Sequence, residues 1–175
     1  ENILKIAIDS PAAAGAGTLA KKISNHYKLF YLDTGKIYRY IALLKLKFPK
    51  KFNKKFIKSK IISLKIKKLS NVELLSDKIG NEASIISKSK HIRKLVHNFQ
   101  LKCAYDPPKK YKGSCLDGRD ITYKIIPDAD FKFYITASRK VRALRRYNEL
   151  KKLNKKVVYK EVLKSIKNRD KSDLN

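Results

Sequence analysis

Close to its start the chain reads Ile6-Ala7-Ile8-Asp9-Ser10-Pro11-Ala12-Ala13-Ala14-Gly15-Ala16-Gly17-Thr18-Leu19-Ala20. The apolar residues before Asp9 are typical of a buried strand, and the small residues after it are typical of a tight loop that leads into a helix. A P-loop, with the pattern G-x-x-x-x-G-K-[ST], has this layout because backbone N–H groups and a helix N-terminus together bind phosphate. Taken alone, the stretch leaves two interpretations open: an ordinary strand–turn–helix of an α/β domain, or a loop that binds the phosphates of a nucleotide, with the Thr18 hydroxyl as a magnesium ligand.

Two positions depart from the P-loop pattern. Ser10 stands in place of the first glycine and keeps a small side chain, whereas Ala16 stands in place of the lysine and removes a cation. That cation normally contacts the β- and γ-phosphates, and the loss of one preorganised donor typically costs about 10²–10³ in rate. The sequence therefore leaves three alternatives open: a slow enzyme, a protein that binds nucleotides without turnover, or an enzyme in which lid arginines or Lys21 replace the lysine.

The composition predicts a globular protein. The chain has 175 residues, of which 43% are hydrophobic and 10% aromatic, enough for one domain with a full core. Its apolar runs are too short to span a membrane. Two cysteines are too few for a disulfide framework, so we expect reduced thiols and a cytosolic location.

The net charge of +28 raises nucleic-acid binding as an alternative function. However, only 8 of the 43 basic residues are Arg, and a lysine excess alongside many Ile and Asn residues is what an A/T-rich coding sequence would produce. We interpret the basic segment 45–68 as a lysine-coated insertion. Nucleic-acid binding therefore rests on charge alone, and we regard it as unlikely.

The arginines are more informative than the lysines, because a planar guanidinium binds phosphate in a way that an ammonium does not reproduce. We interpret Arg139 as ordinary surface charge. The remaining candidates for anion binding are Arg39, Arg93, Arg119, Arg142, Arg145, Arg146 and Arg169.

Periodicity predicts alternating strands and helices. Strands are expected over 4–9, 30–32, 114–116 and 131–136; helices are expected over 17–27, 36–47, 71–79, 81–88, 90–104, 138–153 and 159–170. The segment 48–69 is left open. The alternation predicts an α/β fold with a parallel sheet covered by helices, in which ligands lie at the carboxyl ends of the strands.

Several motifs, taken together, resemble one family. They are Ile6-Ala7-Ile8-Asp9-x-Pro11-Ala12, Tyr31-Leu32-Asp33-Thr34-Gly35-x-x-Tyr38-Arg39, Leu116-Asp117-Gly118-Arg119-Asp120 with Pro127-Asp128-Ala129-Asp130, and Ile166-Lys167-x-Arg169-Asp170-x-x-Asp173. In this order they resemble the bacterial cytidylate kinases. The resemblance implies a P-loop nucleoside monophosphate kinase fold and phosphoryl transfer from ATP to CMP or dCMP with Mg²⁺. It also implies a core of about 1–44 and 113–175, a CMP-binding insertion of about 45–112, a lid of about 146–170, and no membrane partner; we expect a monomer.

The resemblance also implies site residues. ATP is expected on Ser10, Pro11, Ala12, Ala13, Ala14, Gly15, Ala16, Gly17 and Thr18, and Mg²⁺ on Thr18 and Asp117. CMP is expected on Thr34, Tyr38, Arg39, Ser84, Arg93, Arg119, Asp120, Arg169 and Asp173. The catalytic arginines are expected at Arg119, Arg142, Arg145 and Arg169.

Three of these residues also have simpler interpretations. Thr34 could cap a helix, Asp120 could cap the turn before Ile121, and Ser84 could stand at a helix start. The family pattern continues past Asn175 with an Arg, a strand and a helix. We therefore expect a truncated sequence with one uncovered sheet edge.

Overall fold

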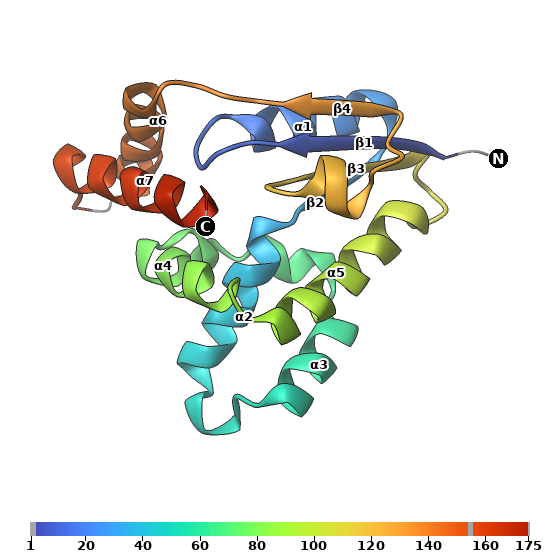
Figure 1. Ribbon diagram of the computed structural model, residues 1–175, viewed down its shortest axis with the longest axis horizontal. Helices are drawn as coiled ribbons and strands as arrows, with labels where there is room; N and C mark the ends of the chain where they lie inside the picture. Colours follow the sequence, from blue (N-terminus) through green and yellow to red (C-terminus); the bar gives the residue numbers. More distant parts are fainter. Residues whose placement is uncertain (1–2, 154–155, 175) are drawn as a thin grey trace.

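The computed structural model of the protein describes residues 3–153 and 156–174. Within them lies one sheet of four parallel strands, β1 (Leu4–Asp9), β2 (Phe30–Asp33), β3 (Gly113–Gly118) and β4 (Phe131–Tyr134), in the order β2-β3-β1-β4 (Figure 1). Ala7 and Leu32 both pair with Leu116, which places the carboxyl ends of β1, β2 and β3 at one edge of the sheet. The predicted parallel α/β sheet is confirmed.

Helices cover both faces of the sheet. Ile6, Ile8 and Cys115 pack on α1 (Ala16–Tyr27), because successive strand residues point to opposite faces. Ala7, Leu32 and Leu116 belong to the larger core with α2 (Gly35–Lys47) and α5 (Lys90–Tyr105). Two further helices, α6 (Arg139–Lys152) and α7 (Tyr159–Leu174), lie beyond the carboxyl ends of the strands (Figure 1). In the described part of the chain, no helix is long and apolar enough to cross a membrane.

Between α2 and α5 the chain forms mostly short helices. They are η1 (Pro49–Lys51), α3 (Lys54–Ile62), η2 (Ile66–Ser70), η3 (Val72–Leu75) and α4 (Asp77–Ile86). The segment that the sequence left open is ordered by burial of Ile57 and Ile61 of α3 beneath its lysines. This segment and α5 pack below the sheet and around α2 (Figure 1).

The predicted boundary between the helices over 71–79 and 81–88 is wrong. The structure has the short η3 and then one helix, α4, which begins where the Ser76 hydroxyl accepts a hydrogen bond from the Ile79 N–H at 3.3 Å. Gly80 lies inside α4 and does not end it. A Cβ at Gly80 would lie 2.7 Å from Arg39 Nη2, so the glycine makes room for a guanidinium from α2.

A π-helical turn, η4 (Ile121–Ile125), follows β3, and the sequence did not predict it. The buried Asp9 carboxylate at the end of β1 accepts hydrogen bonds from the N–H groups of Ile121 (2.8 Å) and Thr122 (3.0 Å). This anchor fixes the connection from β3 to η4, which carries Arg119 and Asp120. At the far edge of the sheet, β4 is shorter than predicted and all four of its residues are exposed.

Candidate active site

A cavity of about 320 Å³ lies at the carboxyl ends of β1, β2 and β3, and residues 10–18 form one side of it. The other sides carry charged residues from separate parts of the chain. They include Lys21, Asp33, Lys36, Arg39, Asp117, Arg119, Arg146, Glu149 and Arg169. The predicted loop thus faces a charged cavity.

The loop has the backbone shape of a phosphate-binding turn. Gly15, with φ of 96°, precedes α1, and Ala13 has φ of 60° in the left-handed region that non-glycine residues rarely adopt. Ala16, the first residue of α1, is 4% exposed and packs in the same core cluster as Ile8, and its methyl group brings no charge to the cavity. The loop therefore offers N–H groups and a helix N-terminus without a cation of its own.

Two predicted catalytic arginines donate hydrogen bonds to backbone carbonyls of this loop. Arg145 Nη1 donates to the Ala14 carbonyl at 2.7 Å, and Arg142 Nη1 donates to the Ala12 carbonyl at 3.2 Å. Arg142 also donates to both oxygens of Asp170. Among the described residues that line the cavity, neither arginine is present, whereas their neighbour Arg146 is.

Four arginines do reach the cavity: Arg39, Arg119, Arg146 and Arg169. Arg39 Nη1 donates to the carbonyls of Leu74 (2.6 Å) and Ser76 (3.1 Å), which ties α2 to the start of α4. Burial, together with the charges of Arg169 and Arg146, lowers the pKa of Arg39 to about 10. Burial and the charge of Arg119 likewise lower the pKa of Arg169. Cations that destabilise one another in this way favour an anion between them.

Acidic residues stand between the loop and α2. Burial, and then the charge of Asp33 on the neighbouring strand, raise the pKa of Asp117 to about 8. Asp117 Oδ2 lies 3.4 Å from the place of a Cβ on Gly17, close to the first turn of α1 where Thr18 lies. Mg²⁺ is usually bound by one or two carboxylates together with substrate phosphates and waters, and these residues fit that donor set. Within the described ranges no group of three or more His, Cys, Asp or Glu residues could hold a metal ion.

A second cavity of about 360 Å³ lies between α5 and η4 and includes Tyr38, Arg93, Gln100 and Asp120. Arg93 Nη2 pairs with Asp120 Oδ2 at 2.6 Å, which joins the insertion to the connection after β3. The Asp120 carboxylate is therefore directed at Arg93, and its interpretation as a turn cap is not what the structure has.

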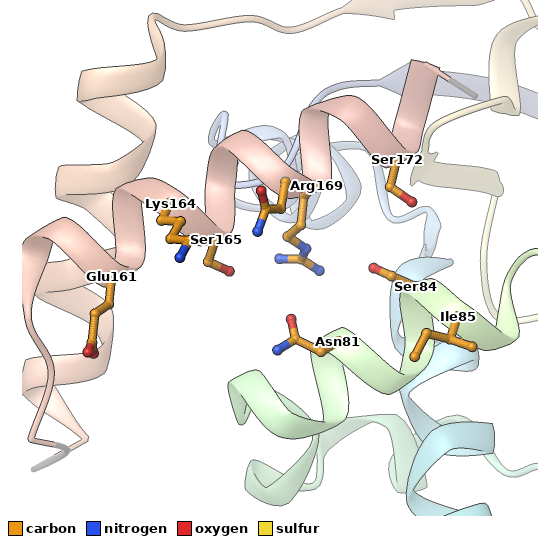
Figure 2. A pocket seen from close by; sticks show the side chains of 9 residues that line it. Asn81, Ser84, Ile85, Glu161, Lys164, Ser165, Arg169 and Ser172 are labelled. Atoms are coloured by element: carbon orange, nitrogen blue, oxygen red, sulfur yellow. The ribbon is translucent and has the colours of Figure 1, made fainter.

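A third cavity, of about 390 Å³, separates α4 from α7. Figure 2 shows the Arg169 side chain reaching from α7 toward α4, and Ser84 and Ser172 facing each other across the gap. Ser84 lies inside α4 and not at a helix start. Arg169 lines this cavity and the first one, so the two spaces meet at its guanidinium.

Thr34 and Asp173 have partners within the protein. The buried Thr34 hydroxyl donates to the Asp117 carbonyl at 2.7 Å, which joins the ends of β2 and β3; it does not cap α2. Asp173 Oδ2 accepts from Arg119 Nε at 2.7 Å. The structure thus groups most of the predicted residues around two cavities, and it places Thr34 beneath the first one as a support.

Sequence reasoning assigned no role to Asp33, Lys36 or Tyr31, although all three line the first cavity. The sequence did point to them. Tyr31 and Asp33 belong to the motif Tyr31-Leu32-Asp33-Thr34-Gly35-x-x-Tyr38-Arg39 at the end of a strand, and Lys36 stands at its first unspecified position. Arg146 was a candidate for anion binding without an assigned place in the site. Its Nη2 donates to the Leu75 carbonyl at 2.6 Å, a contact with the distant insertion that the sequence does not reveal.

The protein has a parallel sheet, a phosphate-binding loop at the carboxyl edge of that sheet, and arginines that converge on the loop. These features define a P-loop protein. The sequence model of the cytidylate kinase family matches residues 6–175. The cytidylate kinase of Bartonella tribocorum is 41% identical over 170 residues, which cover 97% of this chain and 77% of that protein. Those of Mesorhizobium japonicum and Bradyrhizobium diazoefficiens are 37% and 39% identical over 99% and 97% of this chain, and the matches cover 79% of each relative. The chain belongs to the cytidylate kinase family.

Proposed function

We propose that this protein transfers the γ-phosphoryl group of ATP to CMP or dCMP, giving ADP and CDP or dCDP. The observation that carries the proposal is the convergence of Arg39, Arg119, Arg146 and Arg169 on the P-loop in a member of the cytidylate kinase family. Phosphoryl transfer needs positioning and charge stabilisation more than covalent chemistry, and such a cavity supplies both.

ATP would lie with its phosphates on residues 10–18, where the loop N–H groups and the N-terminus of α1 face the cavity. Thr18 and Asp117 are the residues that would hold Mg²⁺, which when bound neutralises charge on the phosphates. Arg142 and Arg145 would act by keeping the loop carbonyls of Ala12 and Ala14 turned away from the phosphates.

CMP would lie between the insertion and the core. Arg39, Arg119 and Arg169 would bind its phosphate, with Tyr38 beside them. Asp120 and Arg93 place an acceptor and a donor side by side, which suits the amino group and the ring acceptors of cytosine. Ser84 and Asp173 would complete the contacts to base and sugar, and Thr34 would support the floor of the site.

The reaction itself needs no base from the protein. An anionic phosphate oxygen of CMP attacks the γ-phosphorus, a P–O bond forms, and the bond to the β–γ bridging oxygen breaks with its electron pair leaving on ADP. The guanidinium groups stabilise the charge spread over the transferred group.

Residues of about 45–112 would move as the CMP-binding insertion and residues of about 146–170 as the lid. Residues 154 and 155 of that lid lie outside the described part of the chain. A monomeric state and a cytosolic location remain predictions.

An ADP-release assay tests the proposal with CMP, dCMP, UMP and AMP as acceptors and a reaction without acceptor as the blank. We expect turnover of CMP and dCMP and far slower reaction with UMP and AMP. Asp120→Asn should lower kcat/KM for CMP about 100-fold, since a misplaced amide leaves the cytosine amino group unpaired. Equal rates for all four acceptors would contradict the assigned base site.

One observation favours a second candidate, a relative that binds nucleotides without turnover: Ala16 leaves the loop without its lysine. In that case an ATP analogue and CMP would bind, ADP release would not exceed the blank, and Ala16→Lys would restore it. Activity in the unmodified protein would exclude this candidate.

A further inference from the structure

The loop lacks a cation at residue 16, yet two lysines, Lys21 and Lys36, line the same cavity. We propose that Lys36 is a catalytic residue that binds the transferred phosphoryl group and replaces the missing P-loop lysine from the opposite wall of the cavity. This inference rests on the function proposed above and assigns a residue to the same reaction.

The position of Lys36 is the first argument. It lies in the first turn of α2, directly after β2, and its backbone N–H donates to Asp33 Oδ1 at 3.3 Å. Lys36 lines the cavity together with Gly17, Thr18 and Asp117, so its side chain shares that space with the first turn of α1.

The energetics of Lys36 are the second argument. A cation in the first turn of a helix is disfavoured by the helix dipole. Lys36 also shares the cavity with four arginines, and across the described residues no carboxylate forms an ion pair with it. A half-buried ammonium without an ion-pair partner is the pattern expected where a residue serves a ligand.

The other cations near the loop are less suited to this role. Arg142 and Arg145 bond to loop carbonyls and are not among the described residues that line the cavity, and Arg39 Nη1 bonds to two carbonyls of the insertion. Lys21 is exposed and lies five residues along α1 from Ala16, whereas Lys36 is half-buried. Lys36 is therefore a half-buried cavity cation without an ion pair among the described residues, a property that it shares with Arg169, to which the CMP phosphate is assigned above.

An ammonium at this place would donate hydrogen bonds to oxygens of the γ-phosphoryl group while the bond to ADP breaks and the bond to CMP forms. It would stabilise charge in the transition state and also bind the triphosphate in the ground state. Removing such a donor should lower kcat about 100-fold. It should also weaken the binding of a non-hydrolysable ATP analogue.

The experiment compares five proteins: the unmodified chain, Lys36→Ala, Lys21→Ala, Lys22→Ala and Ala16→Lys. Lys22 is an exposed residue of α1 outside the cavity, so Lys22→Ala is the charge-matched control. For each protein, kcat with CMP, the Kd of AMP-PNP by calorimetry and the thermal midpoint are measured. We expect Lys36→Ala to lose about 100-fold in kcat and about 10-fold in AMP-PNP affinity with no loss in thermal midpoint. The control should stay within threefold of the unmodified chain.

A sixth protein, with Ala16→Lys and Lys36→Ala together, tests replacement directly. If both lysines serve the same phosphoryl group, the loss caused by Lys36→Ala should shrink to a few-fold in the Ala16→Lys background, because residues with a shared partner are not additive. An undiminished loss in that background would overturn the inference. So would a kcat and a Kd of Lys36→Ala within threefold of the unmodified chain, or an equal loss from Lys21→Ala.

The two proposals fail in different ways. If the unmodified chain turns over no monophosphate, the proposed function fails, and the AMP-PNP affinities alone then decide whether Lys36 binds the triphosphate. If the unmodified chain is active but Lys36→Ala is equally active, the function stands and the assignment of Lys36 is wrong.

Discussion

Arg142 and Asp170 form two parallel hydrogen bonds, Nη1 to Oδ1 at 2.8 Å and Nη2 to Oδ2 at 2.7 Å, that join α6 to α7. The Arg142 side chain is only 6% exposed. Asp170→Ala should therefore destabilise the protein by about 3 kcal/mol at pH 7, because it leaves a buried guanidinium without its partner. Urea unfolding measures the change, with the exposed Asp106→Ala as control.

The same pair predicts a pH dependence. The hydrogen bond from Arg142 lowers the pKa of Asp170 below its ordinary value. A lowered carboxylate pKa adds stability above the unfolded value of about 3.9, and this stability is lost as the pH falls through the lower folded value. The difference between the unmodified protein and Asp170→Ala should thus shrink as the pH falls below about 4. A difference that grows under acid would contradict this account.

Asp9 should matter for stability and for substrate binding together. Its carboxylate accepts from the N–H groups of Ile121 and Thr122, and Ile121 is fully buried. Asp9→Ala leaves these donors unpaired and should cost about 2–4 kcal/mol in urea unfolding. It should also weaken CMP binding by calorimetry, since Arg119 and Asp120 directly precede the anchored turn. Unchanged CMP affinity in folded Asp9→Ala would show that the anchor does not position them.

Gly80→Ala should raise the KM for CMP while leaving the free energy of unfolding nearly unchanged. Replacement of a glycine inside a helix gains about 1 kcal/mol. The new Cβ would lie 2.7 Å from Arg39 Nη2, however, and would displace that guanidinium. We expect a free energy of unfolding within about 1 kcal/mol of the original, because the two effects offset each other, and a KM for CMP raised about 10-fold.

The control for this prediction is the same change in an Arg39→Ala background. There the glycine has no guanidinium to accommodate, so Gly80→Ala should no longer affect KM. An equal rise in KM in both backgrounds would mean that Gly80 acts through something other than Arg39.

Replacement of Lys28 by glycine should stabilise the protein. This exposed residue ends α1 with φ of 56° and ψ of 44°, in the left-handed region. Lys28→Gly should raise the free energy of unfolding by about 0.5–1 kcal/mol. Lys22→Gly, which removes the same charge from the middle of the same helix, should lower it by about 1 kcal/mol. Effects of the same sign in both variants would point to charge and not to backbone conformation.

The sheet and most of its helices were predictable because their signals are local. A short run of apolar residues before Asp9 predicted β1, and the motifs after β2 and β3 placed Asp33 and Asp117 at one edge of the sheet. The division of 71–88 was not predictable in the same way. Gly80 has the pattern of a helix terminator, and only the guanidinium of Arg39, from a distant helix, explains a glycine inside α4.

The membership of the candidate site was predictable only in part, and its geometry was not. Arginine identity pointed to anion binding, and Arg39, Arg119 and Arg169 do line the cavity. The sequence could not separate Arg142 from Arg146, because both lie on α6 and tertiary partners decide their direction. Arg142 is directed to Asp170 and the loop carbonyl of Ala12, and Arg146 to the insertion.

The edge strand β4 affects how readily the protein self-associates in solution. Its rings Phe131 and Phe133 lie parallel in solvent, with centroids 6.5 Å apart, and β4 is the last strand in the order of the sheet. An open strand of this kind can recruit another extended chain, and mutual repulsion between molecules of net charge +28 opposes such recruitment. Because dissolved salt screens that repulsion, concentrated samples should self-associate more readily at high ionic strength than in dilute buffer.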